Sequence, residues 1–389
     1  MSSIHLADRM NDIRPFYVMD LLARAKQLEA CGRSIIHLEV GEPDFATPDT
    51  IINAGHAALD AQLMHYTPAV GLLELRQMIS DHYRLRFNIE VPVNRIVITP
   101  GASGALQLAL SVLINPGDEV LMTDPGYPCN RHFVRLLEGT GVNIPVSSET
   151  CYQLTSDLID QYSSERTVAT LIASPSNPTG TIVDKDQMQS IIDTVARQNS
   201  YLLIDEIYQG LTYETESYTA LSMTDQAFVI NSFSKFFGMT GWRLGWMVVP
   251  EEFMGAVDKL AQNIFLAPPT LSQYAAIEAF SDKTMGILEQ RRQEFERRRD
   301  YLVPALKSLG FEIPVDPAGA FYVYANCSRF TNDSFVFVNQ LLDEVGVAIT
   351  PGLDFGEYNA SHHVRFAYTR SIPVLEEAVS RLKEYLKNF

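Results

Sequence analysis

The sequence predicts an α/β fold in which a large domain has a mostly parallel sheet covered by helices on both faces, beside a smaller α+β domain. Three observations predict it. The chain has 389 residues, which at roughly 150 residues a domain favours one large and one small domain. From residue 95 onward, short apolar segments alternate with longer segments of helical periodicity, which is typical of a parallel sheet. After residue 281 this alternation gives way to short strands and amphipathic helices.

Six short apolar segments rich in β-branched residues are predicted to be buried strands. They are RIVITP (95–100), EVLMTDP (119–125), VATLIASP (168–175), YLLIDE (201–206), AFVINSF (227–233) and LGWMVVP (244–250). Between them, residues 103–114 and 185–199 carry apolar side chains at the i, i+3, i+4, i+7 spacing of helices. Ligands of such sheets bind in the crevice at the carboxyl ends of the strands, so the residues just after each strand are the candidates for a site.

The part of the chain after the sixth strand is organised differently. A polar helix rich in Arg and Glu (288–300) precedes three short strands, and an amphipathic helix (373–388) follows them. The three strands are FYVYA (321–325), VGVAIT (345–350) and VRFAYT (364–369). We therefore expect a large domain over residues 47–280 and a small C-terminal domain over residues 281–389, with residues 1–46 forming an N-terminal arm and part of the small domain.

Charge and composition exclude several classes of function. The chain has 30 Lys and Arg against 47 Asp and Glu, a net charge of −17, which is the wrong sign for general binding to nucleic acid or to an anionic membrane. Charged residues interrupt the N-terminal segment, and no later segment approaches about 18 consecutive apolar residues, so neither a signal peptide nor a membrane helix is expected. The four cysteines show no Cys-x-x-Cys spacing, which favours free thiols and gives no sign of a metal site. We expect a cytoplasmic protein.

The first strand runs into a turn of small residues, 99–104 (TPGASG), that opens a helix. Such a turn presents unpaired backbone N–H groups and a hydroxyl, which suit one phosphate group. Its spacing differs from GxGxxG, from the P-loop and from GxSxG, so dinucleotide binding, ATP binding and serine-hydrolase activity are disfavoured. On its own the turn also fits a plain helix start with small residues for packing.

The fifth strand continues into residues 232–246, SFSKFFGMTGWRLGW. Lys235 and Arg243 lie here among serines, glycines and aromatic side chains, where a buried charge is costly unless it has a partner or loses its proton. A lysine in an apolar pocket supplies the neutral amine that forms a Schiff base with a carbonyl compound. Arg243 with Ser232 and Ser234 would bind a phosphate through forked and hydroxyl hydrogen bonds.

With this segment the sequence resembles the pyridoxal-phosphate-dependent class I aminotransferases of fold type I, whose Schiff-base lysine lies in a similar motif. The resemblance extends from about residue 41 to the C-terminus. The other matching motifs, in chain order, are Gly41-Glu42-Pro43-Asp44, Tyr66-Thr67-Pro68, Asp124-Pro125-Gly126-Tyr127-Pro128, Asn177-Pro178-Thr179-Gly180, Asp205-Glu206-Ile207-Tyr208 and Arg365. The resemblance implies an enzyme that moves the amino group of an L-amino acid to a 2-oxo acid with pyridoxal 5'-phosphate as cofactor.

The resemblance also implies what individual residues do. Lys235 would be the catalytic residue, because its Nζ would bind the cofactor as a Schiff base and then carry the substrate's Cα proton. Asp205 would pair with the ring nitrogen and keep it protonated. Tyr208 and Asn177 would bind the ring oxygen, and Tyr127 would stack on the ring.

Further residues complete the implied site. The cofactor would be bound by Ala102, Ser103, Tyr127, Asn177, Asp205, Tyr208, Ser232, Ser234, Arg243 and Tyr66 of the partner subunit. The substrate's α-carboxylate would be bound by Gly41, Asn177 and Arg365. Because Tyr66 would complete the neighbour's pocket, we expect a homodimer with shared active sites.

Each matching residue also has a plain structural interpretation. Asn177 fits a turn in its own right, and Asp205 fits the N-cap of a helix after its strand. Arg365 alternates with apolar neighbours in a strand and fits a solvated residue on the polar face of a sheet. The order of these motifs at successive strand ends favours the functional interpretation.

Two other functions stay open beside transamination. A C–S β-lyase would use every residue above and differ only in how the intermediate is protonated. A non-catalytic regulator that binds pyridoxal phosphate would carry an attached DNA-binding module, for which an acidic chain starting close to the fold's own beginning gives no support.

The substrate's side chain is the least defined part of the prediction. Some aspartate-specific members that the chain resembles carry a lysine in the phosphate turn, and the corresponding position here is Ser103. The segment expected to border the pocket, residues 16–18, is apolar, so a distal carboxylate would be costly to bury. We expect neutral or aromatic donors, and 2-oxoglutarate stays open as an acceptor if Arg131 or an arginine of the partner subunit enters the pocket.

Overall fold

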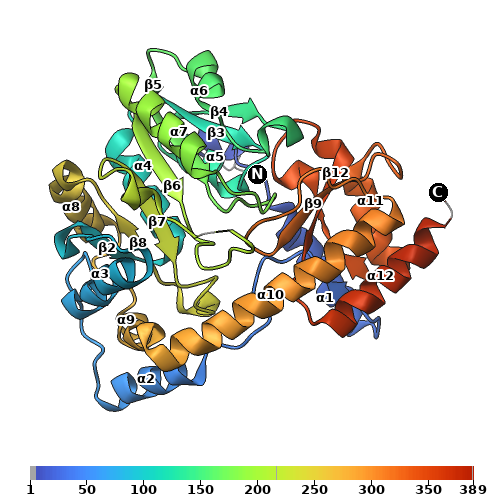
Figure 1. Cartoon of the computed structure of the whole chain (residues 1–389), viewed down its shortest axis with the longest axis horizontal. Helices are drawn as coiled ribbons and strands as arrows, with labels where there is room; N and C mark the ends of the chain where they lie inside the picture. The colour runs from blue at the N-terminus through green and yellow to red at the C-terminus, as the bar shows by residue number, and fades with distance from the viewer. Residues whose placement is uncertain (1–5, 216, 388) are drawn as a thin grey trace, which may run out of the picture.

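The computed structural model describes residues 6–215, 217–387 and 389, and its largest unit is a seven-stranded sheet in the order β2-β8-β7-β6-β5-β3-β4 (Figure 1). Its strands are β2 (Ile96–Thr99), β3 (Glu119–Asp124), β4 (Thr140–Pro145), β5 (Thr167–Ala173), β6 (Tyr201–Asp205), β7 (Phe228–Ser232) and β8 (Gly245–Val248). Only β8 runs antiparallel to its neighbours, and the other pairs are parallel. The predicted mostly parallel sheet and its six strands are confirmed.

The seventh strand, β4, was missing from the sequence prediction. It lies at the edge of the sheet, paired with β3 alone, and most of its side chains are exposed or half-buried. Its sequence, TGVNIP, lacks the continuous apolar segment that marks the central strands. An edge strand that buries little apolar surface leaves little hydrophobic pattern to detect.

Helices cover the sheet on both faces. They are α2 (Asp49–Asp60), α3 (Leu73–Phe87), α4 (Gly101–Leu113), α5 (Pro128–Leu136), α6 (Ser156–Tyr162), α7 (Lys185–Arg197), α8 (Met254–Ile264) and α9 (Thr270–Ile277). Successive strand residues point to opposite faces: Leu202 and Ile204 join one buried cluster with α2, α3 and α7, whereas Leu203 joins a second with α4 and α8. The two predicted helices, 103–114 and 185–199, correspond to α4 and α7.

The C-terminal part holds a small antiparallel sheet in the order β11-β12-β9. Its strands are β9 (Tyr322–Asn326), β11 (Thr350–Pro351) and β12 (His363–Ala367), and its helices are α10 (Asp282–Leu309), α11 (Ser334–Gln340) and α12 (Ile372–Leu386). The predicted helix 288–300 is the middle of α10, which Figure 1 shows running from beside α2 and α9 toward this sheet. The predicted strand 345–350 is interrupted: it forms β10 (Val347–Ala348) and the start of β11.

The N-terminal segment lies against this C-terminal part. After helix α1 (Tyr17–Ala30), strand β1 (Ile36–His37) pairs in parallel with β10, and α1 is anchored because the carboxylate of Asp354 accepts hydrogen bonds from the backbone N–H groups of Tyr17 and Val18. The domain limits at residues 46 and 280 stay a prediction. In the part of the chain that the structure describes, no helix is long and apolar enough to cross a membrane.

Candidate active site

Lys235 lies in the turn that follows β7, with its amine facing residues from distant parts of the chain. Its Nζ donates a hydrogen bond to the backbone oxygen of Gly41 at 2.7 Å and lies 5.7 and 5.8 Å from the ring centroids of Tyr208 and Phe321. Burial, helped by the nearby cation of Arg365, lowers the pKa of Lys235 to about 8. A large fraction of this amine is therefore neutral near pH 8, as a nucleophile or base requires.

Asp205 is the last residue of β6 and is buried. Its Oδ1 accepts a hydrogen bond from the backbone N–H of Ile207 at 3.1 Å. A turn follows the strand instead of a helix, so the interpretation of Asp205 as a helix N-cap is wrong. Burial raises the pKa of Asp205 to about 7. A cation placed beside this carboxylate would restore its ionised form.

Arg365 is 3% exposed in the middle of β12, so the interpretation as a solvated surface arginine is wrong. Its Nη1 donates to Oδ1 of Asn177 at 2.9 Å, and its Nη2 donates to the backbone oxygen of Glu39 at 2.5 Å and to Oγ1 of Thr350 at 3.3 Å. Its buried Nε finds no acceptor among the described residues. All three of these acceptors are neutral and the nearby carboxylate of Asp354 makes no hydrogen bond to the guanidinium, so the unused N–H of Arg365 suits an anionic ligand.

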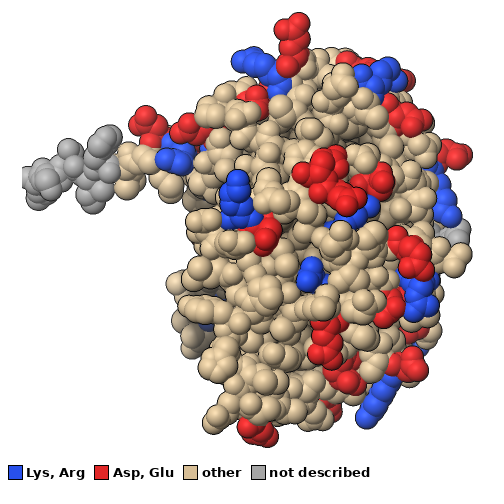
Figure 2. All heavy atoms as spheres, turned by 90° about the vertical axis from the view of Figure 1, so that its left-hand side faces the viewer, with Lys and Arg blue, Asp and Glu red and all other residues tan. Residues whose placement is uncertain are grey.

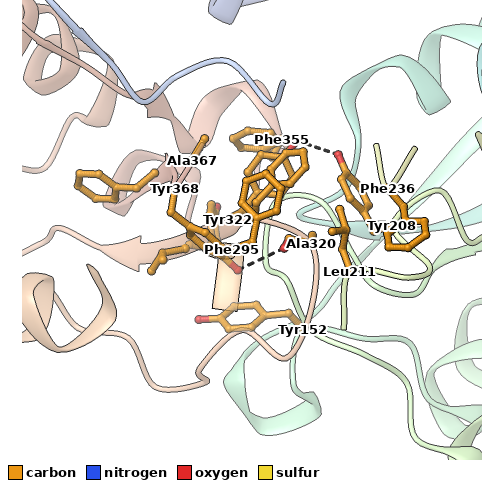
Figure 3. Close-up of a cluster of buried hydrophobic side chains, with 14 of the residues drawn as sticks. Tyr152, Tyr208, Leu211, Phe236, Phe295, Ala320, Tyr322, Phe355, Ala367 and Tyr368 are labelled. Atoms are coloured by element: carbon orange, nitrogen blue, oxygen red, sulfur yellow. Dashed lines mark hydrogen bonds between the residues drawn. The ribbon is translucent and has the colours of Figure 1, made fainter. Parts of the chain in front are cut away.

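Tyr322 is a site residue that the sequence analysis missed. Its hydroxyl oxygen lies 2.7 Å from the hydroxyl oxygen of Tyr208. A Cβ added to Gly41 would lie 1.9 Å from the Tyr322 hydroxyl oxygen. Figure 3 draws both tyrosines within a cluster of buried aromatic side chains. The alternation of Tyr322 and Tyr324 along β9 was visible in the sequence, but that pattern alone predicts only packing.

The small-residue turn places the start of α4 beside Arg243. Gly101, the first residue of α4, has a φ of +71°, and a Cβ there would lie 2.8 Å from Nη2 of Arg243. The residue before the helix provides no side-chain cap for its first N–H groups. Unpaired N–H groups beside a guanidinium form a site for an anion, which favours phosphate binding over a plain helix start.

The serines of the lysine segment lie next to this turn. Ser232 and Ser234 are both buried, and the backbone N–H of Ser234 donates to Oγ of Ser232 at 3.0 Å. A Cβ on Gly245, which is paired with Ser232 across β7 and β8, would lie 2.8 Å from the backbone nitrogen of Ala102. Ala102, half-buried with Ser103 in the first turn of α4, thus lies close to the end of β7 that carries Ser232.

Tyr127 and Tyr66 differ in their surroundings. Tyr127 precedes α5 and lines a cavity together with Asn177, Arg131 and Phe355, and burial raises the pKa of its hydroxyl well above the ordinary value. Tyr66 is 84% exposed in the loop after α2. Within one chain the structure therefore brings Tyr127 to the site and leaves Tyr66 outside it.

Comparison with known proteins gives consistent matches along the chain. Residues 33–382 match the family model for aminotransferases of class I and II. A (5-formylfuran-3-yl)methyl phosphate transaminase of Methanocaldococcus jannaschii is 38% identical over 98% of this chain and 99% of its own length. A valine–pyruvate aminotransferase of Mycobacterium tuberculosis is 36% identical over 96% of this chain and 97% of its own. The crystal structure of an aminotransferase from Mycobacterium tuberculosis superposes with a TM-score of 0.96 at 35% identity, covering all of both chains.

Proposed function

The chain belongs to the class I and II aminotransferases, and from this premise we propose that it moves the amino group of a neutral or aromatic L-amino acid to a 2-oxo acid through Lys235. It is a pyridoxal-phosphate-dependent transaminase of fold type I, acting on amino acids and 2-oxo acids. The observation that carries the finer proposal is the meeting of Lys235, Asp205 and Arg365 around one buried site: Lys235 comes from the turn after β7, Asp205 from the end of β6 and Arg365 from β12.

The residues present fit the cofactor. When bound, pyridoxal phosphate supplies an aldehyde that condenses with an amine and a ring that withdraws electrons from the adjacent carbon. We assign the phosphate to the uncapped start of α4, where Arg243 lies against Gly101. The buried carboxylate of Asp205 suits the protonated ring nitrogen, and the hydroxyl of Tyr208 suits the ring oxygen. The phosphate would also contact Ala102, Ser103, Ser232 and Ser234.

Lys235 would act twice. Its Nζ would hold the cofactor covalently at rest, and when free it would accept the proton from Cα of the substrate and return it. Both steps need the neutral amine, which the lowered pKa of Lys235, about 8, supplies near neutral to mildly basic pH.

The substrate's α-carboxylate would be bound by Arg365. Its Nε is free of acceptors among the described residues, and Asn177 holds its Nη1 in place. With the backbone at Gly41, this arrangement would fix the carboxylate and thereby the direction of the bond from Cα to its hydrogen.

Two observations support neutral donors. Arg131 already donates to the backbone oxygen of Asp354 at 2.9 Å, and the carboxylates of Asp124 and Asp354 lie near enough to offset its charge, so it is poorly placed for a second carboxylate. Ser103 offers a hydroxyl in place of a cation. The Mycobacterium tuberculosis relative, named for valine and pyruvate, is in keeping with a small neutral pair.

The test is a panel of donors with one common acceptor. We expect kcat/KM for phenylalanine, methionine or alanine to exceed that for aspartate, and a clear preference for aspartate would overturn the donor assignment. A second assay, with a cysteine S-conjugate as substrate and no 2-oxo acid acceptor, decides the lyase alternative: release of pyruvate and ammonia would show β-elimination.

We also propose that the enzyme is a homodimer in which Tyr66 of the partner subunit completes the phosphate site. Figure 2 turns to the viewer the side that carries α2, α3 and α8, and much of the surface there has no charged side chain. The exposed apolar side chains from α2, the loop after it and the adjoining ends of α3 and α8 are Leu59, Leu63, Met64, Tyr66, Leu73, Ile264 and Leu266. Apolar surface gathered in this way favours a protein interface.

Sedimentation at assay concentration tests the dimer. Leu63→Glu combined with Met64→Glu should yield monomers that lose cofactor, because an incomplete pocket binds it weakly. Leu85→Glu, at an exposed position near the other end of α3, is the matched control and should remain dimeric. A fully active monomer would contradict the proposal.

A further inference from the structure

We propose that Tyr322 is a positioning residue that links the two halves of the site: its hydroxyl orders Tyr208 for the cofactor ring, and its ring supports Arg365 for the substrate's carboxylate. The inference rests on the proposed function and deepens it with a residue outside every motif of the sequence analysis.

The first link is the pair of hydroxyls. Tyr322 is 1% exposed, and Tyr208 is equally enclosed, with their hydroxyl oxygens 2.7 Å apart. The two rings meet edge to face at 5.6 Å. Figure 3 shows the hydroxyl contact as a dashed line between a side chain of the C-terminal part and Tyr208, which lies in the turn after β6. Each hydroxyl has one proton, so in this pair one donates and the other accepts.

The second link is the contact with Arg365. The guanidinium carbon lies 4.3 Å from the centroid of the Tyr322 ring and 4.7 Å from that of Phe355. A cation over an aromatic face is attracted to it, most strongly where water is excluded. The two rings therefore hold the guanidinium plane, in addition to the hydrogen bonds made by its Nη atoms.

Gly41 adds a third contact on the same side chain. A Cβ there would lie 1.9 Å from the Tyr322 hydroxyl, so the backbone at Gly41 comes as close as a residue without a side chain allows. That same backbone accepts the hydrogen bond from Lys235. Three predicted site residues, Gly41, Tyr208 and Arg365, thus meet on Tyr322.

Which of the two hydroxyls donates the hydrogen bond has a chemical consequence. When Tyr208 donates its proton to the cofactor's ring oxygen, the proton between the two tyrosines comes from Tyr322, so Tyr208 accepts from Tyr322, and two such consecutive hydrogen bonds strengthen one another. Without the Tyr322 hydroxyl, Tyr208 stabilises negative charge on that oxygen less well. The bound cofactor should then hold its titrating proton to higher pH.

The other charges around this pair stay in place when the hydroxyl is removed. Asp205 and Arg365 lie near Tyr208, and Arg365 and the phenol of Tyr127 lie near Tyr322. Lys235 lies beside the Tyr208 ring, and Glu42 and Arg243 act on Lys235 in opposite directions. A difference in titration midpoint between proteins that differ only in a tyrosine hydroxyl therefore reports on the hydrogen bonds that run from Tyr322 to Tyr208 and on to the ring oxygen.

The experiment is a pH titration of the visible absorbance of the bound cofactor in the holoenzyme, for Tyr322→Phe, Tyr208→Phe and the double variant. We expect Tyr322→Phe to raise the titration midpoint by about 0.3 to 1 pH unit. We expect no further shift when Tyr322→Phe is added to Tyr208→Phe, because without the Tyr208 hydroxyl the Tyr322 hydroxyl no longer acts on the ring oxygen. Equal shifts in the two backgrounds, or no shift in either, would overturn the proposal.

Tyr324→Phe is the matched control. Tyr324 lies two residues along the same strand, is 4% exposed, and its hydroxyl has no partner among the described residues. Its removal should leave the midpoint unchanged, and a shift like that of Tyr322→Phe would overturn the proposal by pointing to general packing. A wild-type protein that binds no pyridoxal phosphate would instead overturn the proposed function itself.

The support of Arg365 is tested by binding of 3-phenylpropanoate, a carboxylate without an amino group. Tyr322→Leu removes the ring and should weaken binding about threefold to tenfold, whereas Tyr322→Phe keeps the ring and should bind as the wild type does. Equal affinity in all three proteins would overturn this half of the proposal.

Discussion

The lysine segment, residues 232–246, and the strand β9 both contribute to the candidate site, yet they differ in what their sequences reveal. The segment concentrates a lysine, an arginine and two serines among aromatic side chains, so its chemistry is visible along the chain. In β9, Tyr322 is one tyrosine in a buried strand, and its contacts with Gly41, Tyr208 and Arg365 come from the fold alone. Reacting groups can be read from local sequence, whereas groups that orient them depend on contacts between distant segments.

The largest effect on activity is expected when Lys235 is replaced. If the segment holds the reacting amine, Lys235→Ala should lower kcat by about a thousandfold or more, since both the attachment of the cofactor and the proton transfer are lost. Single-turnover formation of the 2-oxo acid measures this. Lys259→Ala, in the exposed part of α8, is the control and should retain full activity. Retained turnover in Lys235→Ala would place the reacting amine outside the segment.

Asp205→Asn tests the large sheet's contribution to the ring. Asparagine has nearly the same shape but no charge, so the ring nitrogen would lose the carboxylate that keeps it protonated. We expect the rate of the proton-transfer half-reaction to fall about 100-fold or more, with the fold retained. Stopped-flow absorbance gives the rate, and a half-reaction as fast as that of the wild type would exclude the role.

Arg365→Ala tests whether the small C-terminal sheet contributes recognition of the substrate's carboxylate. A hydrogen bond to a charged group contributes about 1.5–3 kcal/mol, so kcat/KM for amino acids should fall at least tenfold. Amines without a carboxylate should lose much less, because they do not use the guanidinium. Equal losses for the two kinds of substrate would count against carboxylate recognition and favour a structural role for Arg365.

The smallest expected effect concerns stability of the cofactor-free protein. Burial raises the pKa of Asp205 from 3.8 to about 7, so between these values the folded state binds the proton that the unfolded state has released. The free energy of unfolding therefore decreases as pH rises through this window, by up to about 1.4 kcal/mol per pH unit from this group.

Asp205→Asn should remove that part of the slope, which urea unfolding at pH 5 and pH 7 measures in the two proteins. Identical slopes would mean that the carboxyl of Asp205 is not held away from solvent in the cofactor-free protein.

The sequence was sufficient for the parts of the fold that bury continuous apolar segments. Six strands of the large sheet follow from such segments, α4, α7 and α12 follow from helical periodicity, and α10 follows from a polar segment rich in Arg and Glu, whereas β4 at the sheet edge buries too little to be detected. In the site, Lys235, Asp205, Asn177 and Arg365 follow strand ends or lie in strands with apolar neighbours, and the resemblance to a family supplied their roles.

What the sequence could not supply was contact between segments that lie far apart in the chain. The support of Arg365 by Tyr322 and Phe355 joins β12 to β9 and to the loop after β11. The anchoring of α1 by Asp354 joins residues more than 300 positions apart. Such contacts depend on packing, which leaves no periodic signal.

The most direct test of the account is borohydride reduction of the holoenzyme followed by peptide mapping. Reduction makes the link between cofactor and lysine permanent, so the label identifies the residue that holds it. The account predicts a single pyridoxyl label on Lys235, in the peptide that carries residues 232–246. A label on another lysine, or cofactor-loaded protein that takes up no label, would contradict the central claim that this segment carries the reacting amine.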